Sequence, residues 1–286
     1  MQEELSEAHI LGAVDLFLDA NEKTLIRIFP HGVENSNCHI QVDGADYVIR
    51  FYGAEHSQTG SRSKSHITFE LKFMQAAARA GLPVAPIVRT KTGELFAEHD
   101  GAQVVLFGFM EGEAPTNFSP DMTRQVAETL AHMHTMATSL DIQEERTSNG
   151  SLLEALERRL EKYEDPDLRT ENELTSRIDP ILADFRADGH VQDIQSLERY
   201  PIHNDVIYHN IAFHEGQLSA VFDFDDCHRG AFLDDIMRTA FKYLDEPSIC
   251  ITGDSGEHCN PMQYEGWHFR MVPQKESYQM PALLKE

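Results

Sequence analysis

The sequence predicts an α+β fold in which an antiparallel sheet with one inserted helix precedes a mainly helical second lobe. Three observations support this prediction. Short β-rich runs with a hairpin signal occupy the first part of the chain, one amphipathic stretch interrupts them, and helical spacing dominates afterwards. The chain has 286 residues, of which 41% are hydrophobic and 25% charged, so it is long enough for two lobes and has an ordinary globular composition.

The first lobe is expected over residues 1–110. A helix is predicted over 3–20, because Leu11, Val14 and Phe17 share one face, and a second helix over 62–80. Strands are predicted over residues 25–29, 38–42, 47–52, 87–90 and 104–107. The second and third of these flank Asp43-Gly44, which is a strong signal for a two-residue hairpin turn. This order predicts a β-meander with an inserted helix.

The second lobe is expected over residues 111–246, followed by a weakly patterned tail over 247–286. Ser119 is a candidate N-cap with Pro120 at the first helical position, and an apolar stripe continues to Ala137. Further helices are predicted over 151–163, 173–187 and 232–244, and short strands between 200 and 222. We expect the tail to be the least ordered part of the chain, because neither helical nor strand periodicity persists there.

The charge of the chain excludes two classes of partner. It carries 24 basic and 48 acidic residues, a net charge of −24, and such a surface repels nucleic acids and anionic membranes. Residues 1–110 contribute 9 minus 14, or −5, and residues 111–286 contribute 15 minus 34, or −19. If the protein binds a charged molecule, we therefore expect a cation beside the second lobe. The alternative is that the acidic surface serves solubility alone.

Other features of the composition indicate a cytoplasmic protein with reduced thiols. No apolar run approaches the roughly 18 residues of a membrane helix, and no basic leader precedes an apolar segment at the N-terminus. The four cysteines form no Cys-x-x-Cys pair, and only Cys250 and Cys259, with His258 between them, hint at a metal. His132 and His134 lie beside the apolar stripe of a predicted helix, so we interpret them as packing residues.

The segment His203-Asn204-Asp205-Val206-Ile207-Tyr208-His209-Asn210 carries the strongest functional signal. A strand then leads to Asp223. Phosphoryl transfer needs a carboxylate that orients and deprotonates a hydroxyl, and oxygen ligands for the magnesium ions that neutralise phosphate charge. Asp205, Asn210 and Asp223 have the types and the order that this chemistry uses in protein kinases. The alternative interpretation is that His203, Asp205 and Asn210 only satisfy a polar turn.

With this motif the chain resembles the aminoglycoside phosphotransferase and choline kinase-like family, which has the two-lobed protein-kinase-like fold. The resemblance runs over residues 24–244. It implies that Asp205 is the catalytic base, that Asn210 and Asp223 hold Mg²⁺, and that His203 and Asp235 support the catalytic loop. Asp235 is also explained as an ordinary acidic residue in the first turn of a helix.

The first lobe matches the nucleotide-binding half of the same family. Residues 32–37 are predicted to form a loop over the phosphates of ATP, with Asn35 and Ser36 as its polar side chains. Arg50 on the third strand is expected to contact the α and β phosphates and to pair with Glu70 on the inserted helix. Arg50 is alternatively a surface residue of an edge strand. Residues 106–110 would form the hinge, where Phe107 and Phe109 offer backbone groups to adenine.

Two departures from the family pattern concern the catalytic loop and the end of the chain. Asn204 stands where the family usually has glycine, and asparagine tolerates unusual backbone angles well. Family members generally continue past the Asp235 helix with several more helices, whereas here only the tail follows. The acceptor pocket is then either unusually open, or the chain is a truncated member.

The resemblance implies an ATP- and Mg²⁺-dependent kinase that phosphorylates a hydroxyl of a small, amine-bearing and cationic molecule. Aminoglycosides, choline and other amino alcohols are the candidate acceptors. One alternative is a homoserine kinase-like enzyme, because residues 32–37 also resemble the corresponding loop of those kinases. The others are a truncated pseudokinase that binds nucleotide without turnover, and an interaction protein without a nucleotide site.

Overall fold

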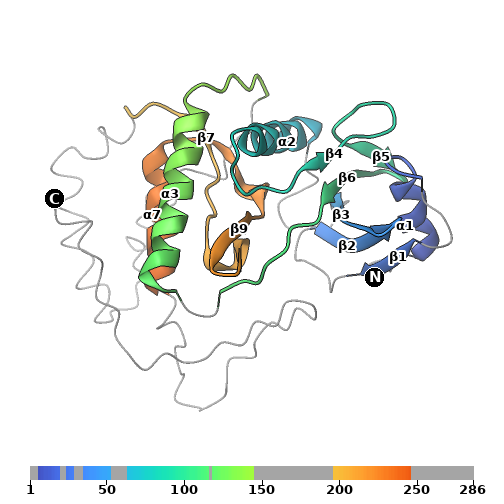
Figure 1. Ribbon diagram of the computed structural model, residues 1–286. Coiled ribbons are helices and arrows are strands. Elements are labelled where there is room, and N and C mark those ends of the chain that lie inside the picture. The colour runs from blue at the N-terminus through green and yellow to red at the C-terminus, as the bar shows by residue number, and fades with distance from the viewer. Residues whose placement is uncertain are drawn as a thin grey trace, which may run out of the picture.

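The computed structural model describes residues 6–19, 24–28, 35–52, 63–115, 118–144 and 196–245, and for 240–245 the backbone alone. A β-sheet with helices α1 and α2 forms one end of the described chain, and helices α3 and α7 lie at the other (Figure 1). The helices predicted over 151–163 and 173–187, the tail over 247–286, and Cys250, His258 and Cys259 fall outside the described residues.

The sheet is antiparallel throughout and has the strand order β1-β2-β3-β6-β4, with β5 pairing with β6. Its strands are β1 (Leu25–Ile28), β2 (Asn35–Val42), β3 (Ala45–Tyr52), β4 (Ile87–Val88), β5 (Ala97–His99) and β6 (Ala102–Gly108). Asp43 and Gly44 both have positive φ, which a type I′ hairpin requires, so the predicted turn is confirmed. The sequence prediction missed β5, because three residues are too few to show alternation.

Two helices cover the two faces of this sheet. Successive residues of a strand point to opposite faces. Accordingly, Ile49 and Phe51 of β3 pack in one apolar cluster with helix α1 (Glu7–Val14), and Tyr52 packs in the other with helix α2 (Lys64–Arg79). Helix α1 is shorter than predicted, and Phe17 is buried from the turn that follows it.

The second region combines helices α3 and α7 with two small two-stranded sheets. Its elements are α3 (Pro120–Ala137), β7 (Tyr200–Ile202), η1 (Tyr208–Asn210), β8 (Ile211–His214), β9 (Gln217–Val221), η2 (Phe224–Asp226), β10 (His228–Gly230) and α7 (Phe232–Asp245). Strand β7 pairs with β10, and β8 pairs with β9. The start of α3 is confirmed, because the Ser119 hydroxyl accepts a hydrogen bond from the Met122 amide and Pro120 opens the helix.

One apolar cluster joins α2 to the second region and includes Val221 at the end of β9. The rings of Phe73 on α2 and Phe224 on η2 meet edge to face, with centroids 5.7 Å apart. The Val221 amide donates a hydrogen bond to the Pro83 carbonyl at 2.7 Å, which fixes β9 against the segment after α2. No described helix combines the length and apolar character that crossing a bilayer requires.

Candidate active site

Asp235 at the start of α7 holds the loop that follows β7. Its fully buried carboxylate accepts hydrogen bonds from the backbone amides of His203, at 3.2 Å, and Asn204, at 2.8 Å. Asn204 has φ +64°, a left-handed conformation that asparagine adopts more readily than most residues. The backbone therefore turns sharply before Asp205, and the expectation for Asn204 is confirmed.

Two histidines complete this buried network. His134 on α3 lies 2.9 Å from the Asp235 carboxylate through its Nε2 and stacks on Phe232. His203 Nδ1 accepts a hydrogen bond from the Asp205 amide, so Nε2 carries the proton and donates it to the Phe222 carbonyl at 2.9 Å. Burial lowers the pKa of His203, which is consistent with this neutral form. His134 is a satisfied packing residue as expected, but the sequence did not reveal its carboxylate partner.

The loop aims the Asp205 side chain at Asn210 and Arg238. The Asn210 amide Nδ2 donates to the backbone carbonyl of Asp205, at 3.0 Å, and to its carboxylate, at 2.8 Å. Arg238 on α7 places Nε 3.4 Å from Asp205 Oδ1 and Nη2 3.2 Å from an Asp226 oxygen. Burial raises the pKa of Asp205, and the Arg238 charge opposes that rise. Arg238 escaped the sequence analysis, because its spacing from Asp205 indicates no contact.

Asp223 lies half-buried directly after β9, with its backbone in the left-handed region at φ +56° and ψ +65°. Its Oδ1 is shielded from solvent and has no hydrogen-bond partner among the described residues. Burial, followed by the negative charge of Asp225, raises the pKa of Asp223 to about 7, although the charge of Arg50 opposes the rise. A carboxylate oxygen that is shielded from solvent and has no hydrogen-bond donor requires a cation or a proton to balance its charge.

Arg50 reaches toward the same place from β3 and pairs with two acids. Its Nη1 lies 2.9 Å from the carboxylate of Asp225 and 3.7 Å from that of Glu70 on α2. The Glu70 carboxylate also accepts a hydrogen bond from the Tyr52 hydroxyl. The expected partner Glu70 is thus within ion-pair distance, but Asp225 is nearer. The sequence analysis had not selected Asp225, because acidic residues beside Asp223 are also common on surfaces.

The residues predicted to cover the phosphates lie on strand β2. Asn35 donates a side-chain hydrogen bond to Asp225, and Asn37 accepts one from Arg50 Nε at 3.0 Å. Ser36 lies between them, opposite Phe51 of β3. The strand therefore begins earlier than expected, and residues 32–34 of the proposed loop fall outside the described residues.

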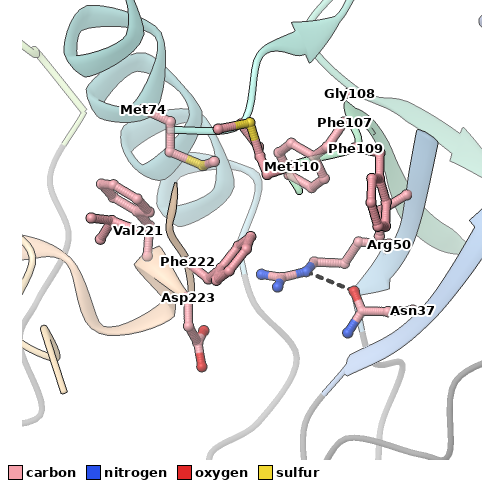
Figure 2. Close-up of a pocket in the computed structure, with 13 residues that line it drawn as sticks. Asn37, Arg50, Met74, Phe107, Gly108, Phe109, Met110, Val221, Phe222 and Asp223 are labelled. Atoms are coloured by element: carbon pink, nitrogen blue, oxygen red, sulfur yellow. Dashed lines mark hydrogen bonds between the residues drawn. The ribbon is translucent and has the colours of Figure 1, made fainter. Parts of the chain in front are cut away.

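An apolar pocket opens beside this polar cluster, between the hinge and the end of β9 (Figure 2). It is lined by Asn37, Val48, Arg50, Met74, Ala85, Phe107, Gly108, Phe109, Met110, Val221, Phe222, Asp223 and Phe224. Figure 2 shows the Arg50 guanidinium and the Asp223 carboxylate at the same end of the pocket. A Cβ at Gly108 would lie 2.8 Å from Pro86 Cγ, so the hinge needs glycine for its close approach to Pro86.

The donor atoms at the polar end of the pocket fit a hard divalent cation. Among the described residues the Oδ1 atom of Asp223 has no partner, and the neighbouring negative charge of Asp225 favours a cation there. Asn210 uses its amide nitrogen to hold Asp205, which leaves its amide oxygen as a further donor. Oxygen ligands of this kind suit Mg²⁺. Asn210 and Asp223 could therefore hold such an ion.

Two curated proteins that are similar in sequence to this chain are homoserine kinases. A homoserine kinase from Polaromonas naphthalenivorans is 25% identical over 223 residues, which cover 77% of this chain and 66% of the relative. One from Zymomonas mobilis is 23% identical over 225 residues, which cover 77% of this chain and 65% of the relative. The chain thus spans about two thirds of the length of these relatives.

Solved structures show a similar fold. An amicoumacin kinase in complex with AMP-PNP, Ca²⁺ and Ami superposes with a TM-score of 0.59 at 18% identity, over 83% of this chain and 69% of that one. A putative aminoglycoside phosphotransferase from Ralstonia eutropha gives 0.54 at 18% identity, over 83% and 70%. This likeness confirms the expected two-lobed kinase-like fold. The family model described as "Phosphotransferase enzyme family" matches residues 25–270. Because that match covers most of the chain, the protein belongs to this phosphotransferase family.

Proposed function

We propose that the protein is an ATP-dependent phosphotransferase that phosphorylates a hydroxyl of a small, amine-bearing molecule. One observation carries the proposal: Asn210 is hydrogen-bonded both to Asp205 and to the Phe222 amide beside Asp223, and Asp223 lines the polar end of an apolar pocket with Arg50. Apolar walls suit a nucleobase, and the cation and acids at one end suit its phosphates and their metal ion.

Each side chain has a part in this chemistry. Asp205 accepts the proton of the acceptor hydroxyl, and Arg238 favours its ionised form. Asn210 and Asp223 hold Mg²⁺, which when bound neutralises charge on the phosphates of ATP. Arg50 contacts the α and β phosphates and is held in place by Glu70 and Asp225.

The rest of the nucleotide site comes from the sheet. Backbone groups of Phe107 and Phe109 at the hinge bind adenine. Asn35 and Ser36 lie at the start of β2, near the phosphates, where Asn35 fixes the carboxylate of Asp225. His203 and Asp235 hold the loop that presents Asp205. Asp235 acts by positioning, because it contacts the loop backbone and His134.

Two features favour an acceptor with an amine. Residues 111–286 carry a net charge of −19, and Asp205 and Asp226 contribute carboxylates beside the proposed hydroxyl site. Homoserine is a specific candidate, since it carries both an amine and a hydroxyl and the curated relatives named above are homoserine kinases. Aminoglycosides, choline and ethanolamine share the same two groups or a quaternary analogue of the amine.

The direct test is an ATP-consumption screen of the full chain with Mg²⁺ across homoserine, aminoglycosides, choline and ethanolamine. We expect phosphorylation of at least one acceptor, with turnover reduced about 100- to 10,000-fold in Asp205→Asn. Nucleotide binding is measured in parallel by thermal shift with and without Mg²⁺. Binding of ATP without transfer to any acceptor would favour the pseudokinase, and absence of ATP binding would favour an interaction protein.

A further inference from the structure

A cluster of two histidines and one aspartate lies on the face of the sheet that α1 covers. His9 projects from α1, His99 ends β5, and Asp100 begins the turn between β5 and β6. His9 also contacts the ring of Phe51, whose side chain points to this face, whereas Arg50 points to the opposite face. The cluster is thus separated from the candidate active site by the sheet itself.

The three side chains have the spacing of metal ligands. The Asp100 Oδ2 atom lies 3.2 Å from His9 Nδ1 and 3.6 Å from His99 Nε2. All three donor atoms lie within 4.8 Å of one another. Ligands at about 2.1 Å in a tetrahedral zinc site lie about 3.4 Å apart, so the separations of Asp100 from the two histidines fall on either side of that value.

The surroundings of His99 also indicate that this side chain binds a metal ion. Its Nε2 is shielded from solvent and has no hydrogen-bond partner among the described residues, because the Asp100 oxygen is beyond hydrogen-bonding distance. The ring lies directly over Gly12 of α1, where a Cβ would come within 2.9 Å of His99 Cε1. Glycine is unfavourable inside a helix, and here it leaves the space that the imidazole needs to face His9.

We propose that His9, His99 and Asp100 form a zinc-type metal site that fastens α1 to the turn between β5 and β6. Two imidazole nitrogens and one carboxylate suit Zn²⁺ and related transition metals, whereas Mg²⁺ and Ca²⁺ prefer oxygen ligands alone. Water completes the tetrahedron on the exposed side of Asp100. The site is independent of the proposed kinase activity, since its ligands lie on the other face of the sheet.

The test is Zn²⁺ titration of the full chain by calorimetry, in an Asp223→Asn background and excess Mg²⁺ so that the candidate active site does not take up zinc. We expect one Zn²⁺ per chain. His9→Gln, His99→Gln and Asp100→Asn should each weaken the affinity at least about tenfold. Of these variants, Asp100→Asn should disturb the backbone least, because Asp100 has φ +48° and asparagine tolerates that conformation.

His39→Gln is the matched control. His39 pairs with Asp46 at 2.8 Å on the same sheet, but within the described part of the chain no third metal-ligating side chain joins this pair, so the variant should bind zinc as the parent does. Zinc should also slow amide exchange in residues 7–14 of the parent and not of His99→Gln. The proposal is overturned if the parent binds no zinc, which would leave a plain His9–Asp100 ion pair, or if the three ligand variants bind it unchanged.

Discussion

Two aspartates of this protein have opposite surroundings: Asp235 is fully buried, and Asp223 is half-buried. The carboxylate of Asp235 accepts hydrogen bonds from two backbone amides and lies against His134, so its charge is fully satisfied. Asp223 has one oxygen that finds no partner in the described part of the chain, a left-handed backbone and a pKa raised to about 7. The degree of burial therefore does not predict which carboxylate is satisfied, whereas the hydrogen-bond partners show it directly.

These two environments indicate two roles for a carboxylate, one in holding the fold and one in binding a ligand. A satisfied buried carboxylate stabilises one arrangement of the chain, here the loop that carries Asp205. A carboxylate left without a partner lowers stability, and the protein can retain it when a ligand supplies the missing charge. Substitutions in the two regions should accordingly change different quantities.

The largest expected effect is on turnover, from a change in the loop that Asp235 holds. Asp205→Asn keeps the size of the side chain but removes the proton acceptor, so kcat should fall about 100- to 10,000-fold. The free energy of unfolding should change little, and ATP affinity should stay near that of the parent. Steady-state kinetics on the best acceptor measures this fall in kcat. Asp226→Asn is the comparison variant, because Asp226 also pairs with Arg238 but is not the proposed base. If Asp205→Asn keeps the kcat of the parent, Asp205 is not the catalytic base.

Asp235→Ala should produce the largest loss of stability. It leaves two buried amides and His134 without their acceptor, which costs about 3 kcal/mol in the free energy of unfolding. Urea denaturation measures this loss, and the exposed Asp121→Ala on α3 is the control with little expected change. A loss no greater than that of the control would show that the network around Asp235 contributes nothing to the fold.

Asp223 should make both metal binding and stability depend on pH. Its folded pKa of about 7 lies above the ordinary 3.8, so the metal-free folded protein binds more protons than the unfolded chain between about pH 4 and 7. The contribution of Asp223 to the free energy of unfolding therefore falls as the pH rises through this range. Metal competes with the proton, so Mg²⁺ affinity should fall up to about tenfold per pH unit below pH 7.

The matched variant for this prediction is Asp223→Asn. It should remove that part of the pH dependence in both measurements and weaken ATP binding with Mg²⁺ far more than without it. Fluorescence titration of metal and nucleotide between pH 5 and 8 is the measurement. Equal pH profiles for the parent and Asp223→Asn would place the titrating group elsewhere.

The smallest effect concerns the partners of Arg50. Because Arg50 lies nearer to Asp225 than to Glu70, a double-mutant cycle on the KM for ATP should give a coupling of about 1 kcal/mol for Arg50 with Asp225 and a smaller one with Glu70. The variants are Arg50→Gln, Asp225→Asn and Glu70→Gln. Additive effects for Arg50 and Asp225 would mean that their 2.9 Å contact does not serve nucleotide binding.

Sequence reasoning determined the features that depend on near neighbours. The hairpin at Asp43-Gly44, the cap at Ser119-Pro120 and the spacing of Asp205 and Asn210 are each set within a few residues, because turn and cap chemistry is local. The alternation of β-rich runs and one amphipathic helix likewise predicted the sheet with its inserted α2. Strand β5 was missed, and α1 is shorter than its periodicity predicts, because element ends depend on packing.

Only the tertiary structure decided which distant groups meet. His134 and Asp235 are separated by 101 positions, and Arg50 and Asp225 by 175. No local pattern encodes such contacts, which arise when two elements pack and their buried polar groups must find partners. The same packing gives Asp223 Oδ1 no partner among the residues that the structure describes, and it brings His9 beside His99 and Asp100. Residue types and spacing thus determined the kind of chemistry, whereas packing decided which side chains are satisfied and which remain available to a ligand.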